Sequence, residues 1–242
     1  MDLVFSLNAK IKSAIMKQIN QYPGLWWYIS AVLVLYLGIV IAAQKFPGGF
    51  DWQYTVASAL ASHRYNPDGN IWYAGGFGLS MAFHWPYVSA LKEGLEVSRS
   101  SLNRFALFSI RVGLASGILI GIEGVFIRDL AQWVTKGHEV LAIFAFLGLY
   151  LGLLIFLVQA MTLRIIYGIP ALLVTVPLIA IGVTQFWLWI TQRDIGWLNI
   201  EWRELGIPVW LSFAFWQWLA IVFLTIGLGA LSLIGRKRTG SL

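Results

Sequence analysis

Long apolar segments separated by short polar ones dominate the chain. Each of six segments holds about 20 consecutive, mostly apolar residues, the length that an α-helix needs to cross the hydrocarbon core of a bilayer. Because a helix satisfies its own backbone hydrogen bonds in lipid, each segment is predicted to be a helix rather than part of an open sheet. The segments are 25–44, 71–91, 105–127, 139–161, 169–190 and 208–234.

Composition and charge support a membrane location. Of the 242 residues, 59% are hydrophobic and 12% are charged, whereas a soluble domain carries roughly 25% charged residues. Cysteine is absent, which excludes disulfides and thiolate chemistry. The net charge of +6 is interpreted as attraction to anionic lipid, not to nucleic acid. We therefore predict an all-α, polytopic membrane protein with a bundle of six transmembrane helices.

The distribution of lysine and arginine predicts the orientation of this bundle. With the N-terminus in the cytoplasm, ten of these residues lie inside and six outside, Arg111 within a span being left out. This is the positive-inside bias, and both termini are therefore expected in the cytoplasm. We expect three parts: 1–24 at the cytoplasmic face, 25–234 in the membrane, and a basic cytoplasmic tail, 235–242.

The first part, 1–24, is predicted to form an amphipathic helix. On a helical wheel its apolar residues share one face, and three lysines flank that face. Such a helix is typical of segments that lie on the inner leaflet and contact anionic phospholipid headgroups. Packing on a partner membrane subunit is the alternative. The flanking lysines are Lys10, Lys12 and Lys17.

Between the first two spans, the loop "KFPGGFDWQYTVASALASHRYNPDGN" is expected to be structured. Asp51 is predicted to cap a short helix from residue 52 to about Ser62, lying on the outer membrane face through Val56 and Leu60. Residues 66–69, Asn-Pro-Asp-Gly, indicate a type I turn. Asn70 is then expected to cap the second span.

The same loop carries a family resemblance. Its segment "DWQYTVASALASHRYNPDG" resembles uncharacterised six-span membrane proteins of bacteria and archaea related to the Frag1/DRAM/Sfk1 group, in which Ser-x-Leu-(Ala/Gly)-Ser is followed by Asn-Pro. The resemblance implies a multi-pass protein of a bacterial or archaeal cell membrane with a lipid-linked role, and it carries no catalytic residues. The matching positions are Ser58, Leu60, Ala61, Ser62, Asn66 and Pro67.

The third span combines a packing ridge with an acidic residue. Ser109, Gly113, Gly117 and Gly121 recur every four residues, which predicts close approach of a neighbouring helix. Glu123 lies at the edge of this ridge near the outer end, and a buried carboxylate needs a partner or a proton. A structural role and a functional role both stay open. The residues expected to form an outer polar site are Glu123, His63, Arg64, Asp129 and His138.

Three further polar residues lie within spans. His84 follows Gly76 and Ser80 at four-residue steps, and it is expected either to bond across helices or to bind a proton or ligand. Gln159 shares a face with the Gly148–Gly152 pair and is expected to bond to a neighbouring helix. The stem of Arg111 is long enough to snorkel to the inner headgroups, which predicts contact with lipid or a partner.

No catalytic signature accompanies these residues. The sequence has no H-x-x-x-H or H-E-x-x-H spacing, no glycine-rich phosphate loop and no nucleophile elbow. We therefore predict no metal and no cofactor, leave catalytic residues unassigned, and do not favour an enzyme. The favoured function is a non-catalytic lipid-associated factor or a subunit of a membrane complex. A transporter of small solutes or lipids and an intramembrane metal-dependent hydrolase are the alternatives.

Overall fold

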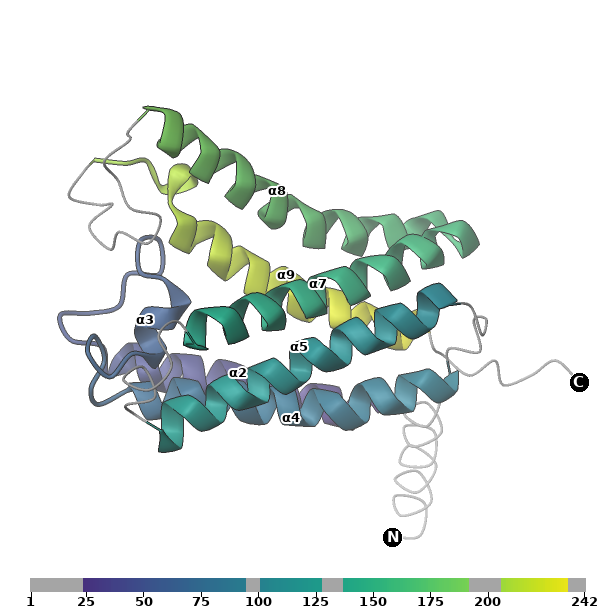
Figure 1. The fold of residues 1–242 in the computed structure, drawn as a ribbon, viewed down its shortest axis with the longest axis horizontal. Coiled ribbons are helices and arrows are strands. Elements are labelled where there is room, and N and C mark those ends of the chain that lie inside the picture. The colour runs from purple at the N-terminus through teal and green to yellow at the C-terminus, as the bar shows by residue number, and fades with distance from the viewer. Residues whose placement is uncertain (1–23, 95–100, 128–136, 192–205, 235–242) are drawn as a thin grey trace, which may run out of the picture.

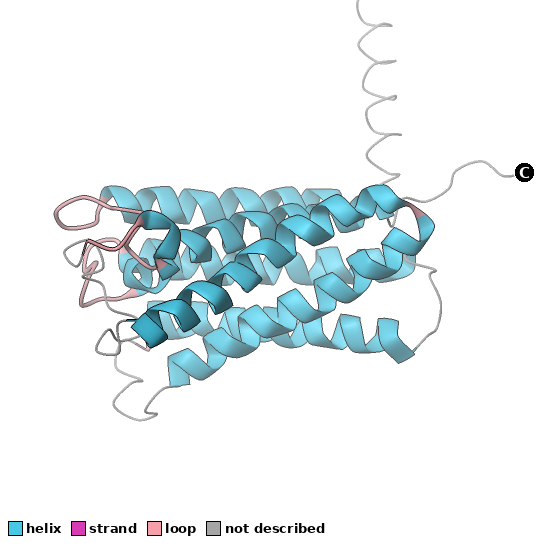
Figure 2. Ribbon diagram, turned by 90° about the horizontal axis from the view of Figure 1, so that it is seen from above, coloured by secondary structure: helices cyan, strands magenta, loops and turns pink. Residues whose placement is uncertain are grey.

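A computed structural model describes residues 24–94, 101–127, 137–191 and 206–234, and every regular element within them is helical (Figure 1). Figure 2 shows the long helices lying side by side, with loops gathered at one end. The elements are α2 (Leu25–Gln44), α3 (Ala57–Ala61), α4 (Asn70–Gly94), α5 (Ser101–Phe126), α7 (Gly137–Leu163), η1 (Ile165–Tyr167), α8 (Gly168–Thr191), η3 (Val209–Leu211) and α9 (Phe213–Ile234).

Each of the six predicted apolar segments coincides with a long helix. Five of the described helices are long and apolar enough to cross a membrane, which is consistent with a multi-pass membrane protein. The other long helix, α4, has 25 residues but is not among the five, because His84, Pro86 and several aromatic residues interrupt its apolar run. The five segments are Leu25–Gln44, Ser101–Phe126, Gly137–Thr162, Ile165–Leu188 and Phe213–Leu233.

The long helices form a row that is closed by the last of them. Helix α2 packs against α4, α4 against α5, and α5 against α7. Helix α9 contacts α7, α8 and α2, while α8 lies at the edge of the bundle (Figure 1). The outward side chains of α8, such as Leu172 and Val183, are exposed and apolar. This surface suits contact with lipid tails.

Helix α4 meets both of its neighbours at glycines. A Cβ atom added to Gly38 of α2 would lie 3.0 Å from the Cα atom of Gly76 on α4. Two residues further along α4, on its opposite side, a Cβ atom on Gly78 would lie 2.8 Å from the Cα atom of Gly121 on α5. Both separations are too short for a side chain, so the helix backbones touch there. In lipid, such close approach of backbones is what holds helices together.

The predicted ridge on α5 is confirmed as a packing surface, and it serves two neighbours. Its N-terminal half faces α7, where a Cβ atom on Gly148 would lie 2.6 Å from the carbonyl oxygen of Ser109 and 2.9 Å from the Cα atom of Gly113. Its C-terminal half faces α4, where a Cβ atom on Gly117 would lie 2.5 Å from Cγ of Met81. One four-residue pattern thus positions three helices.

Tyrosine hydroxyl groups connect α9 to the rest of the bundle. One tyrosine each from α2, α4 and α7 donates a hydrogen bond to a backbone carbonyl of α9. In an apolar interior no water competes for these carbonyls, so the bonds help to fix the position of α9. The donors Tyr28, Tyr87 and Tyr150 bond to the carbonyl oxygens of Thr225, Leu228 and Ala220.

The loop helix α3 is shorter than predicted. It begins only at Ala57, because Val56 has an extended backbone with ψ of 152°. Asp51 caps a turn instead of a helix: its carboxylate accepts a hydrogen bond from the backbone N–H of Gln53 at 3.2 Å, and its carbonyl accepts from Thr55. The expected helix start at residue 52 is therefore wrong.

The position of α3 also differs from the expectation of a helix lying on the membrane face. Val56, Ala59 and Leu60 are 7%, 3% and 0% exposed. They pack into clusters with residues of α2, α4 and α9. The short helix therefore packs into the end of the bundle.

Two of the predicted parts lie outside the described residues. They are the amphipathic helix with Lys10, Lys12 and Lys17, and the tail 235–242.

We predict that Gly121→Leu destabilises the bundle, because its side chain would enter the backbone of α4 at Gly78. Overpacking of this kind costs about 1–3 kcal/mol. The matched control is Gly182→Leu on α8, where an added Cβ atom meets nothing within 4 Å. Thermal unfolding in detergent measures both variants. Equal midpoints would show that the α4–α5 contact does not hold the bundle together.

Candidate functional site

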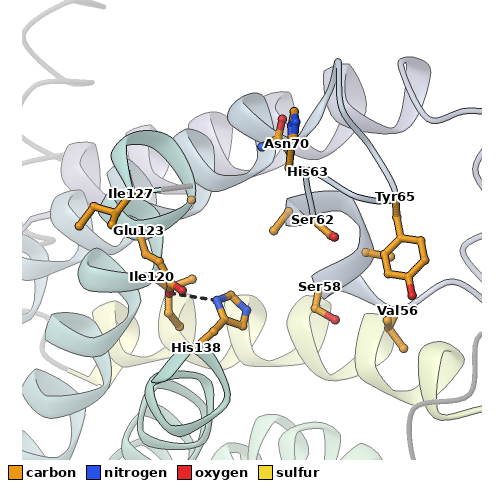
Figure 3. Close-up of a pocket in the computed structure, with 13 residues that line it drawn as sticks. Val56, Ser58, Ser62, His63, Tyr65, Asn70, Ile120, Glu123, Ile127 and His138 are labelled. Carbon is orange, nitrogen blue, oxygen red and sulfur yellow. Dashed lines mark hydrogen bonds and ion pairs between the residues drawn. The ribbon is translucent and has the colours of Figure 1, made fainter. Parts of the chain in front are cut away.

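A pocket of about 420 Å³ opens at the loop end of the bundle (Figure 3). It lies between α3, the start of α4, the end of α5 and the start of α7, and its volume falls in the range of small-ligand sites. Its walls are largely apolar, with a few polar groups at defined positions. The lining residues are Val56, Ser58, Ala59, Ala61, Ser62, His63, Tyr65, Asn70, Ile120, Glu123, Gly124, Ile127 and His138.

The wall formed by α3 is attached to α9. The backbone N–H of Ala57, at the start of α3, donates to the side-chain oxygen of Gln217 at 2.8 Å. The indole N–H of Trp218 donates to the carbonyl of Thr55 at 2.9 Å. Gln217 thus forms a polar connection between α9 and α3. These bonds hold the pocket wall in one place relative to the bundle.

Asn66 holds the other end of the same loop. Its side chain is fully buried, and its Nδ2 donates to the carbonyls of Ala42 at 3.0 Å and Leu60 at 3.2 Å. Because both partners are acceptors, the amide nitrogen must face them. The predicted turn is confirmed by the bond from Gly69 N–H to the Asn66 carbonyl. Asn70 is the first residue of α4 and lines the pocket.

Glu123 and His138 form the polar centre of the pocket. Glu123 lies in the last turn of α5 and His138 in the first turn of α7, and Nδ1 of the imidazole is 3.1 Å from Oε2 of the carboxylate. The side chain of Glu123 is 13% exposed and that of His138 is 41% exposed. In Figure 3 the remaining edge of the imidazole faces across the pocket toward Ser58. The carboxylate thus orients the ring and leaves Nε2 available.

The five residues of the expected outer site have different outcomes. Glu123, His138 and His63 all line the pocket, with His63 exposed at its rim. Arg64 does not line it: its guanidinium lies over the ring of Tyr65, 5.5 Å from the centroid. Asp129 lies outside the described residues. Within the described ranges, no three His, Asp or Glu residues are grouped so that they could hold a metal ion.

Two serines of the loop, part of the segment that carries the family resemblance, also line the pocket. Ser58 lies within α3, Ser62 directly follows its last residue, and both line the cavity. Leu60, between them, is fully buried on the opposite side. The Ser-x-Leu-x-Ser segment therefore combines a packing residue with two hydroxyl groups at the pocket. Nothing in the sequence pointed to Tyr65.

His84 makes its hydrogen bond within its own helix, so the expected bond across helices is wrong. Its Nδ1 is 2.9 Å from the carbonyl oxygen of Ser80, one turn earlier in α4. The ring is 2% exposed and lies edge-on to Tyr28 and Tyr87, with ring centroids 6.0 and 6.1 Å apart. Nε2 of His84 and Nε2 of Gln159 have no hydrogen-bond partner among the described residues.

Arg111 lies on the side of α5 away from the packing ridge. The ridge residues are buried, whereas Arg111 is half-buried, seven residues beyond the exposed Arg104 on the same face. At 1.5 Å per residue, Arg111 stands about 15 Å from the start of α5, within reach of headgroups for a snorkelling side chain. Contact of Arg111 with lipid or a partner stays a prediction.

Compared with known proteins, the chain matches no family model, no curated protein and no solved structure. The resemblance of its first loop to the Frag1/DRAM/Sfk1 group therefore stays a prediction.

We predict that Asn66→Asp opens the pocket wall, because the substitution removes both N–H donors from a fully buried position. Leaving buried acceptors without a donor costs about 1–3 kcal/mol. Asp68→Ala, at an exposed position in the same turn, is the control and should change stability by less than about 0.5 kcal/mol. Protease cleavage within residues 45–69 measures loop opening, and equal cleavage of the two variants would contradict the role of Asn66.

Proposed function

We propose that α4 also crosses the membrane, so that the chain spans it six times with both termini in the cytoplasm. A 25-residue helix is about 37 Å long, enough to cross the hydrocarbon core. Helix α4 lies between α2 and α5, both apolar enough to span, and contacts each along glycines. The count of ten inner against six outer lysines and arginines supports this orientation. The pocket then opens at the outer face.

We further propose that the protein binds a small amphiphilic ligand, such as a lipid, in this pocket without catalysing a reaction on it. The observation that carries the proposal is the Glu123–His138 pair, turned into a largely apolar cavity at the end of two apolar helices. Polar groups at one end and apolar walls around them suit a molecule with a polar head and an apolar part.

The Glu123–His138 pair adds too little to the stability of the fold to explain why a carboxylate stands at this position. Even as a full ion pair, a contact with this exposure would contribute only about 0.2–1 kcal/mol, while a carboxylate near the hydrocarbon region is costly and marks a functional position by default. Toward the middle of the bundle, Tyr73, Phe77, Phe146 and Trp218 pack in one cluster. Filled space inward of the pocket favours binding over passage of a solute, which is why transport is the weaker proposal.

The topology is tested with single cysteines, which is simple because the chain has none of its own. Asp68 and Ser101 are both exposed. Asp68 lies just before the start of α4, and Ser101 begins α5, after the end of α4. We expect Asp68→Cys to react with an impermeant thiol reagent on intact cells, and Ser101→Cys to react only after permeabilisation. Labelling of both from one side would show that α4 does not cross, and the reverse pattern would overturn the orientation.

Ligand binding is tested by filling the pocket. Ser58→Trp places an indole at the pocket wall, and Ser101→Trp makes the same change at the other end of the bundle. Native mass spectrometry of protein extracted with its surrounding lipid is expected to show a bound mass in the wild type and in Ser101→Trp, reduced at least fivefold in Ser58→Trp. A wild type without bound mass, or equal occupancy in both variants, would overturn the proposal.

A further inference from the structure

The polar atoms of the pocket are mostly hydrogen-bond acceptors. When the imidazole of His138 carries one proton, at Nδ1, it donates that proton to Oε2 of Glu123. Nε2 then presents a lone pair to the pocket, and the other carboxylate oxygen of Glu123 accepts as well. Ser58 and Ser62 add hydroxyl groups that accept or donate. A ligand that fits this arrangement supplies N–H or O–H donors.

The charge of the pocket disfavours anionic ligands. Glu123 is the acidic residue that lines it, and among the described lining residues none is lysine or arginine. The nearby Arg64 is turned onto the ring of Tyr65. A phosphate or carboxylate beside Glu123 would meet a carboxylate at short range in a poorly solvated site, and none of the described lining residues carries a basic side chain to offset the repulsion.

We propose that the pocket selects a primary ammonium group, an inference that rests on the proposed ligand-binding function. A protonated amine offers three N–H donors and a positive charge, and charge-assisted hydrogen bonds to a carboxylate are about twice as strong as neutral ones. Glu123 accepts one such bond, and Nε2 of His138 and a serine hydroxyl accept the others. Quaternary ammonium keeps the charge but has no N–H, and a neutral sugar has donors but no charge.

Two sources supply this chemistry: the ethanolamine headgroup of a phospholipid and a free alkylamine. A free alkylamine carries its apolar chain directly on the ammonium, and the apolar lining around Ile120 and Val56 suits that chain. Ethanolamine carries its ammonium two carbons from the phosphodiester, so the ammonium enters the pocket while the phosphate stays outside it, away from Glu123. The source decides whether the protein takes its ligand from the bilayer or from the outer solution. A comparison of lipid-borne and free probes separates the two.

The experiment uses the full chain in nanodiscs of phosphatidylcholine, titrated with four short-chain probes. These are dihexanoyl phosphatidylethanolamine, dihexanoyl phosphatidylcholine, octylamine and octyl glucoside, each below its micellar concentration. Binding is followed by the chemical shifts of histidine side chains labelled with ¹⁵N, which report on His138 directly. We expect the two primary ammonium probes to bind at least tenfold more tightly than the quaternary and neutral probes. Preference between those two probes identifies the source.

Two matched variants test whether the carboxylate of Glu123 is the group that binds the ammonium. Glu123→Gln keeps the shape but removes the charge, and it should lower the affinity for octylamine at least tenfold. Glu139→Gln, at an exposed residue beside His138 that does not line the pocket, should leave that affinity unchanged. An equal loss in both variants would reduce the effect to general surface charge and overturn the selectivity.

The outcomes of the wild-type titration separate the two proposals without any variant. Tighter binding of octyl glucoside or of the phosphatidylcholine probe would overturn ammonium selection and leave the pocket as a ligand site. Absence of any shift of the His138 signal with all four probes would overturn both proposals. The selectivity therefore stays testable even where Glu123→Gln fails to fold.

Discussion

Contact between helix backbones in lipid is the constraint on which the rest of this structure depends. Inside a bilayer, burial of apolar side chains gives no preference for another helix over lipid, so close packing and polar bonds hold helices together. Gly78 and Gly121 bring α4 against α5, and Gly113 and Gly148 bring α5 against α7. Because Glu123 lies two residues beyond Gly121, the same contacts determine where its carboxylate stands.

Hydrogen bonds fix the positions of α9 and of the first loop relative to the helices that pack at glycines. The bonds from tyrosines to α9 are made inside the apolar bundle, and the bonds of Asn66 and Gln217 hold the loop against its end. In such surroundings an unsatisfied polar group is costly, so each of these bonds specifies one arrangement. The pocket is thus enclosed by elements whose positions are fixed independently of any ligand. A pocket built in this way needs no rearrangement to accept the proposed ligand.

Much of the fold was predictable because helices in lipid must be apolar over a known length. All six long helices and the ridge on α5 followed from this rule, and the ridge pointed to Glu123. The loop helix was predicted with the wrong start, because contacts with Gln217 and Trp218, about 160 residues later, decide where α3 begins. The partner of Glu123 was one of several candidates, since the choice depends on how α7 crosses α5. Of the two roles expected for His84, the bond across helices was wrong, because a histidine can also bond to its own helix.

The account stands on the claim that the cavity beside Glu123 and His138 is a ligand site and not a packing defect. An experimental structure of the protein in lipid nanodiscs, at a resolution that shows side chains, tests this most directly. The account predicts non-protein density within the pocket of about 420 Å³, in contact with the Glu123 carboxylate and the imidazole of His138. A pocket filled by the protein's own side chains, or Glu123 turned outward to the headgroups, would contradict it.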